Sequence, residues 1–148
     1  VFINLTRQKV LNPDDMSFFD KFFGANDKSD NKDTNQNGFN WNDLTELKQL
    51  DSIIEESEEK PVVIFKHSTR CSISRMALKN FEREYKADTN DASLYFLDLL
   101  NYRDISNEIA QRFHVIHQSP QLLLIKNGKS VYDVSHSAID AEALENKL

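Results

Sequence analysis

Cysteine is nearly absent from this sequence, which has one, Cys71, among 148 residues, together with three prolines and three glycines. A single thiol cannot close an internal disulfide, so a disulfide-stapled secreted fold is excluded. It also cannot supply the two thiolates of a cysteine-based zinc site, and we predict that the protein holds no metal. No apolar run approaches the roughly 18 residues of a membrane span, so we expect no stable membrane insertion.

Positive charge is in deficit, since 18 Lys and Arg stand against 24 Asp and Glu, a net charge of −6. This balance argues against a nucleic acid as partner, because phosphate backbones attract basic surfaces. The start of the chain, Val1 to Val10, lacks the continuous apolar stretch and small-residue cleavage site of a secretory signal. We therefore expect a cytoplasmic protein. We also expect the protein to be a monomer.

The first part of the chain differs in composition from the rest. Asn26 to Asn40 is almost purely polar and predicts a flexible linker. Before it, a short stripe with helical spacing consists of Phe18, Phe19, Phe22 and Phe23. We interpret this stripe as a short aromatic helix that docks on its own domain, with a weak membrane-surface or partner contact as the alternative.

Two further predictions concern the boundaries of this part. Met16 resembles a natural start, so Val1 to Asp15 is interpreted as upstream sequence. We divide the chain into a largely disordered N-terminal extension, residues 1–38, and a folded domain, residues 39–148.

Strand and helix signals alternate from Phe39 onward. Strands are predicted at Phe39–Trp41, Pro61–Phe65, Ser93–Leu100, Gln121–Ile125 and Val131–Val134. Helices are predicted from Leu44 to Ile54 with Thr45 or Asp43 as N-cap, from Cys71 to Tyr85, from Ile105 to Phe113 with Asp104 as cap, and from Ala138 to Leu148 with Ser137 as cap.

This order, β-α-β-α-β-α-β-β-α, predicts an α/β fold with a mixed central sheet flanked by helices. The early strands are connected by helices and should run parallel with right-handed crossovers. The last two strands are separated by Asn127-Gly128, a strong signal for an antiparallel hairpin.

Cys71 lies between a buried strand and the start of a helix, where reactive groups gather in α/β sheets. The unpaired N–H groups and positive dipole at a helix N-terminus favour the thiolate over the thiol. A lone cysteine is often a small buried hydrophobe, but here the neighbours are polar: Ser68, Thr69, Arg70 and Ser72. We therefore interpret Cys71 as the catalytic nucleophile, with Thr69 and Arg70 beside it.

Ser74 occupies the place of the second cysteine in a C-x-x-C motif. A C-x-x-S sequence cannot resolve a mixed disulfide internally, so a monothiol mechanism follows. We expect Ser72 and Ser74 to donate hydrogen bonds to the sulfur of Cys71, although Ser74 is equally explained as a polar residue of the first helical turn.

Pro120, which follows Ser119 and precedes a strong strand, has two readings. It is either an ordinary proline at a strand start or a cis-proline turn that faces the cysteine. In the second reading, backbone beside Pro120 is free to pair with an extended substrate.

The histidines and one aspartate are further candidate site residues. His67, four residues before Cys71, is a possible base or a strand-end polar residue. His114 and His117 lack further ligands for a metal and are interpreted as surface or turn residues. Asp98, on a strand with apolar neighbours, is predicted to be a buried carboxylate near the site.

The order of elements resembles the thioredoxin superfamily. Within it, the stretch from Pro61 to Leu78, PVVIFKHSTRCSISRMAL, is similar to the YtxJ family of monothiol bacilliredoxins, and the similarity covers about Trp41 to Leu148. The resemblance implies that Cys71 attacks protein–bacillithiol mixed disulfides, takes the bacillithiol onto itself and is reset by another thiol. It also implies that Pro120 is cis. Bacillithiol would be the co-substrate, no cofactor would be bound, and the partners would be bacillithiolated client proteins.

Two alternatives from other functional classes remain at this point. Monothiol relatives with C-x-x-S can share an iron–sulfur cluster between protomers, but cluster-binding glutaredoxins have Gly-Phe where Ser72 and Ile73 stand here. The other alternative is a redox-silent adaptor that uses a thioredoxin-like fold for binding alone.

Overall fold

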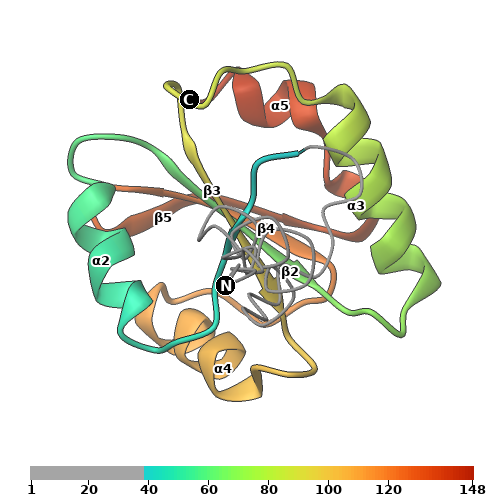
Figure 1. The fold of residues 1–148 in the computed structure, drawn as a ribbon, viewed down its shortest axis with the longest axis horizontal. Coiled ribbons are helices and arrows are strands. Elements are labelled where there is room, and N and C mark those ends of the chain that lie inside the picture. The colour runs from blue at the N-terminus through green and yellow to red at the C-terminus, as the bar shows by residue number, and fades with distance from the viewer. Residues whose placement is uncertain (1–38) are drawn as a thin grey trace, which may run out of the picture. The chain divides into compact units, whose positions relative to one another are not determined.

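The computed structural model describes residues 39–148. The predictions for the extension, its aromatic stripe and its upstream segment lie outside the described residues, so the domain boundary stays a prediction. The described elements follow the predicted order and are, with their bounds, β1 (Asn42–Asp43), α2 (Gln49–Glu56), β2 (Val62–His67), α3 (Ser72–Glu84), β3 (Ser93–Asp98), α4 (Arg103–Arg112), β4 (Gln121–Lys126), β5 (Lys129–Ser135), a 3-10 turn (His136–Ala138) and α5 (Ala141–Glu145) (Figure 1).

The five strands form one mixed sheet in the order β1-β3-β2-β4-β5. β1 and β2 both pair with β3 in parallel, whereas β4 is antiparallel to β2 and to β5. β2 lies at the centre, and all six of its residues are buried. The predicted mixed α/β sheet is therefore confirmed.

Helices cover both faces of this sheet, with α3 and α5 on one side and α2 and α4 on the other (Figure 1). Because side chains alternate along a strand, successive side chains of β2 point to opposite faces of the sheet. Val62 and Ile64 enter the core cluster with the helix residues Leu50, Ile53, Ile105 and Ile109. Val63 and Phe65 enter the opposite cluster with Phe81, Ala141 and Leu144. Burial on both faces explains the unbroken apolar run at the start of β2.

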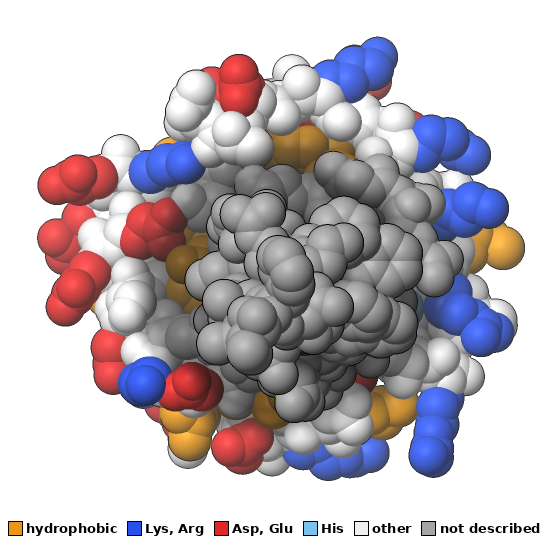
Figure 2. Space-filling model, viewed as in Figure 1, with side chains coloured by type: hydrophobic (Ala, Val, Ile, Leu, Met, Phe, Trp, Pro, Cys, Tyr) orange, Lys and Arg blue, Asp and Glu red, His pale blue; other side chains and the backbone are white. Residues whose placement is uncertain are grey.

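Charge is distributed unevenly over the surface. On the face drawn in Figure 2, Lys and Arg side chains follow the edge along which α3 runs in Figure 1, and Asp and Glu side chains gather on the opposite edge beside α2.

None of the helices formed by residues 39–148 has the length and apolarity that a bilayer crossing requires.

The first strand and helix begin later than predicted. β1 is a two-residue strand, Asn42–Asp43, and not Phe39–Trp41. The rings of Phe39 and Trp41 instead pack together, with centroids 5.0 Å apart, and contact Phe81 of α3. These two aromatic side chains therefore pack in the core below α3 and do not belong to a strand.

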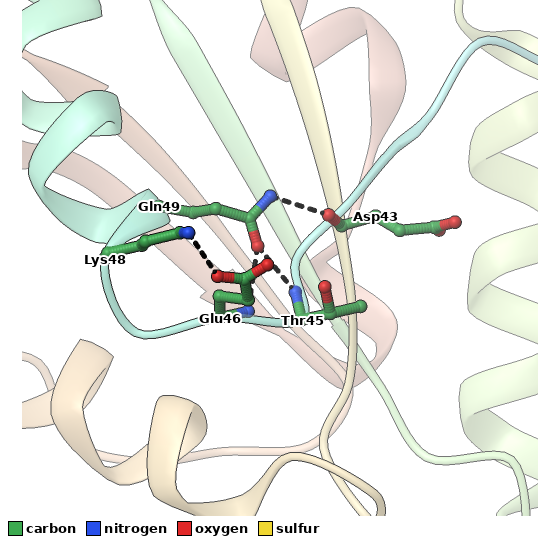
Figure 3. Close-up of polar contacts among 5 residues, drawn as sticks. All are labelled: Asp43, Thr45, Glu46, Lys48 and Gln49. Atoms are coloured by element: carbon green, nitrogen blue, oxygen red, sulfur yellow. Dashed lines mark hydrogen bonds and ion pairs between the residues drawn. The ribbon is translucent and has the colours of Figure 1, made fainter.

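α2 begins at Gln49, so neither Asp43 nor Thr45 caps it. The Gln49 side chain closes the preceding turn, because its Oε1 accepts from the N–H groups of Thr45 and Glu46 (both 2.8 Å) and its Nε2 donates to the carbonyl of Asp43 (2.9 Å) (Figure 3). An ion pair of 2.8 Å between Lys48 and Glu46 lies on the same turn. These contacts keep the segment before Gln49 out of the helix.

The predicted hairpin is confirmed. Asn127 and Gly128 connect β4 to β5 with positive φ angles of 50° and 73°, the backbone that a tight hairpin turn requires. The turn is fastened to the end of α2, since the Asn127 N–H donates to the Ser57 carbonyl and the Gly128 N–H to the Ser57 hydroxyl, each over 2.8 Å.

The caps of the last two helices also differ from the predictions. Asp104 lies inside the first turn of α4, whose N-cap is Tyr102. Ser137 lies in the 3-10 turn, and α5 starts after Asp140, whose carboxylate accepts from the Ala143 N–H over 2.7 Å. Asp140 can cap because its backbone is extended, with φ −140° and ψ 125°.

We predict that Asp140→Ala lowers the free energy of unfolding by about 1 kcal/mol, since it removes the side-chain acceptor of α5. Ser137→Ala is the matched control and should leave stability within about 0.5 kcal/mol of the parent, as for other surface substitutions. Urea unfolding followed by circular dichroism measures both. Equal losses for the two variants would contradict the assignment of the cap.

Candidate active site

Cys71 lies where β2 has left the sheet and α3 begins. It is the N-cap residue of α3, with extended backbone (φ −100°, ψ 121°) and a half-buried side chain. Its N–H donates to the Ser68 carbonyl and its carbonyl accepts from the Arg75 N–H, each over 3.1 Å. The thiol is therefore fixed through its backbone at the positive end of the helix and remains reachable from solvent.

The residues predicted around the thiol fall into an exposed and a buried group. The exposed group, which we call the rim residues, lies beside Cys71 in sequence and consists of Thr69, Arg70 and Ser72. Ser74 and His67 are buried below it, with 0 % and 5 % of their surface exposed. All five residues therefore lie close to Cys71 in or beside the β2–α3 connection, three of them exposed and two of them buried.

Ser74 has a different partner from the one predicted. Its Oγ accepts from the Ser68 N–H over 3.0 Å and lies 2.7 Å from Nδ1 of His67. A hydrogen bond therefore joins the Ser74 hydroxyl to the His67 ring, and in the described part of the chain no hydrogen bond joins Ser74 or Ser72 to the sulfur. The expected contact from Ser74 to Cys71 was wrong because the hydroxyl faces the strand below the helix.

His67 is the side-chain partner of Ser74 in this arrangement. Burial lowers its pKa, with the nearby charge of Asp98 acting against that shift and the charge of Arg75 adding to it. The tautomer of His67 decides which of the two groups, the ring or the Ser74 hydroxyl, donates in this bond. His67 is therefore a structural partner of Ser74, and its ring lies 5.4 Å from that of Phe96.

Asp98 lies beside His67 on the neighbouring strand, at the paired position in the parallel register. Its carboxylate is half-buried, so the prediction of a carboxylate near the site is confirmed in position but not in full burial. The oxygens accept from the Leu100 N–H and the Asn101 side chain, which shapes the turn after β3.

The Ser119–Pro120 peptide bond is cis, as the family resemblance implies. Pro120 directly precedes Gln121, which pairs with Lys66 near the end of β2, so the cis peptide lies at the same end of the sheet as Cys71. The Pro120 carbonyl accepts from the His136 N–H over 3.1 Å. Within residues 39–148, the N–H and carbonyl of Ser119 make no hydrogen bond, and its buried hydroxyl has no partner.

Sequence reasoning missed Lys66, a fully buried lysine of β2. Its Nζ donates to Nδ1 of His117 over 2.7 Å and to Oε1 of Gln121 over 3.3 Å. The bond to His117 ties β2 to the loop that carries Pro120, so the exposed His117 is more than a surface residue. A lysine inside an otherwise apolar central strand was the signal that could have revealed it.

The structure offers no metal centre in its described part, since among residues 39–148 no three His, Cys, Asp or Glu side chains gather as ligands would. His114 is exposed and adopts a positive φ of 54° at the end of α4, a turn position. His117 is held by Lys66 and approached by Ser106 at 3.4 Å. The two histidines therefore have separate surroundings.

The family model of the monothiol bacilliredoxin BrxC matches residues 42–144 of this sequence. The chain belongs to the monothiol bacilliredoxin family. It is thus a thiol–disulfide oxidoreductase with a thioredoxin-like fold, and Cys71 is the one thiol in its sequence.

Solved structures agree with the thioredoxin-like fold. A protein described as having a thioredoxin fold is 32% identical, with a TM-score of 0.60 over 70% of this chain and 89% of that chain. Mitochondrial thioredoxin 3 from Saccharomyces cerevisiae is 20% identical, with a TM-score of 0.56 over 72% of this chain and 92% of that chain. Thioredoxin from Malassezia sympodialis is 22% identical, with a TM-score of 0.56 over 73% of this chain and 87% of that chain. The two thioredoxins support the fold alone.

The buried lysine of this bacilliredoxin gives a prediction for pH-dependent stability. Burial lowers the pKa of Lys66 from 10.5 to about 8, so the folded protein loses this proton more readily than the unfolded chain. Between these two pH values the unfolded state binds more protons, and the contribution of Lys66 to the free energy of unfolding rises with pH. Lys66→Met should remove that rise.

The measurement is the difference in free energy of unfolding between parent and variant, taken by urea titration from pH 7 to pH 10. Taking the difference cancels the contributions of Tyr85 and Tyr95, whose pKa values burial raises to about 12. The control is Lys79→Met, which replaces an exposed lysine. A Lys66→Met difference that stays flat across this range would contradict the prediction.

Proposed function

We propose that this bacilliredoxin removes bacillithiol from protein mixed disulfides in the cytoplasm, with Cys71 as its nucleophile. The observation that carries the proposal is the position of that one thiol: it is half-exposed at the N-terminus of α3, at the sheet end where Ser119–Pro120 is cis. Family membership supports the reaction class, and the absence of a second cysteine in the sequence supports a monothiol route.

The first step is an exchange at sulfur. The Cys71 thiolate attacks the bacillithiol sulfur of the mixed disulfide, a new S–S bond forms between Cys71 and bacillithiol, and the client cysteine leaves as a thiolate with the electron pair of the broken bond. The N–H groups of the first turn of α3 and the helix dipole stabilise the attacking thiolate. No net oxidation occurs, because one disulfide replaces another.

The second step needs a thiol from outside this chain. With Ser74 in place of a resolving cysteine, and its hydroxyl bound to His67, this sequence holds no second thiol that could displace the adduct. A second low-molecular-weight thiolate attacks the bacillithiol sulfur, forms a small-molecule disulfide and returns Cys71 as the thiolate. We assign the site no bound cofactor and treat bacillithiol as a co-substrate of a monomeric protein.

The rim residues and the cis peptide would hold the substrate during this exchange. The N–H and carbonyl of Ser119, next to Pro120, have no partner among residues 39–148 and are suited to pair with the extended backbone around the client cysteine. The exposed neighbours of Cys71 in sequence, Thr69, Arg70 and Ser72, offer polar groups to the bacillithiol half. His67 acts indirectly, by fixing Ser74 and the first turn of α3.

Turnover of a bacillithiolated client protein tests this proposal. We expect Cys71→Ala to abolish release of bacillithiol, because it removes the attacking sulfur. Ser74→Ala should keep turnover at a reduced rate, since it disturbs the turn below the thiol and leaves the sulfur in place. Release is followed by the mass of the client under excess reducing thiol. Normal turnover by Cys71→Ala would refute the mechanism.

A further inference from the structure

Positive charge lies along the helix that starts at Cys71, although the whole protein carries a net charge of −6. Arg75, Lys79 and Arg83 recur every four residues on α3, and all three are exposed. Figure 2 shows Lys and Arg side chains gathered on the edge along which α3 runs in Figure 1. This basic edge lies beside the proposed nucleophile, while the acidic side chains lie beside α2 on the other side of the sheet.

Two of the arginines lie close to Cys71. Arg70 precedes it directly and is exposed. Arg75 lies one helical turn further on the same side of α3, since its N–H donates to the carbonyl of Cys71 over 3.1 Å. Its charge also lowers the pKa of His67, which places the guanidinium within electrostatic reach of the residues below the thiol.

Neither guanidinium has a counter-ion in the described part of the chain. The ion pairs there involve Lys48, Arg83 and Arg112, and Arg83 pairs with Glu84 over 2.9 Å. The carboxylate of Asp98, on the strand beside His67, accepts from its own turn and does not reach an arginine. Near Cys71, residues 39–148 therefore provide two exposed arginines whose charges no carboxylate among them neutralises.

We propose that Arg70 and Arg75 bind carboxylate groups on the small-thiol half of the mixed disulfide. The inference rests on the proposed function and extends it to specificity, because it predicts a preference for small-thiol adducts that carry carboxylates over neutral adducts. Guanidinium is suited to this task, since its fixed donors match a carboxylate in a bidentate geometry. The positive end of α3 acts in the same direction.

The arginines take no part in bond making. They hold the small-thiol half of the mixed disulfide in place. Meanwhile the Cys71 thiolate forms a bond to the sulfur of that half, and the client cysteine leaves as a thiolate. Both side chains are exposed, so each contact should change the rate by only about two- to fivefold, in line with solvent-exposed ion pairs. Together they should change it by about tenfold.

The test uses one single-cysteine client protein in two mixed disulfides, one with mercaptosuccinate, which carries two carboxylates, and one with neutral 2-mercaptoethanol. The readout is the ratio of kcat/KM for the first adduct to kcat/KM for the second. A change in the reactivity of Cys71 or in client recognition alters both rates alike, so the ratio reports on the adduct alone.

We expect Arg70→Gln and Arg75→Gln each to lower this ratio by about two- to fivefold, and the double variant by about tenfold. Arg83→Gln is the control, since it lies two turns beyond Arg75 on α3 and is already paired with Glu84. An unchanged ratio in the double variant, or an equal fall in Arg83→Gln, would overturn the inference. Parent protein that is inactive on both adducts would overturn the inference, and inactivity on the bacillithiol adduct of the same client as well would refute the proposed function.

Discussion

The burial of β2 on both faces of the sheet is the constraint on which the rest of this structure depends. The strand pairs with β3 on one side and β4 on the other, and its side chains enter both core clusters. Its position is therefore fixed, and so is the point where the chain leaves the sheet toward Cys71. Reactive groups at the carboxyl end of such a strand start from a rigid base.

The bond between Ser74 and His67 carries this rigidity into α3. The serine occupies the position at which a dithiol relative would have its resolving cysteine, and its hydroxyl joins the first turn of the helix to the last residue of β2. Replacing the second thiol thus has two consequences, since it removes internal resolution and adds a structural bond below the nucleophile. Lys66 makes a comparable connection from β2 to the loop of Pro120.

Much of this arrangement could be predicted from the sequence, because it depends on local patterns. The apolar run of β2, the four-residue repeat of α3 and the turn at Asn127-Gly128 each specify their element directly. The starts of α2 and α5 could not be predicted, because Gln49 and Asp140 act through side-chain bonds that competing candidates, such as Thr45 and Ser137, could equally have formed. The Gln121 partner of Lys66 depends on strand pairing, and the His67 partner of Ser74 depends on how the connection from β2 to α3 folds, and spacing alone reveals neither.

The most direct test of the central claim, that Cys71 is a fixed and reachable nucleophile which accepts the small thiol itself, is a single turnover without external thiol. Equimolar protein and bacillithiolated client are mixed and analysed by intact mass spectrometry under non-reducing conditions. The account predicts that the mass of bacillithiol moves from the client to this chain, with the adduct mapped to Cys71. A covalent complex between client and Cys71, with bacillithiol released, would contradict it.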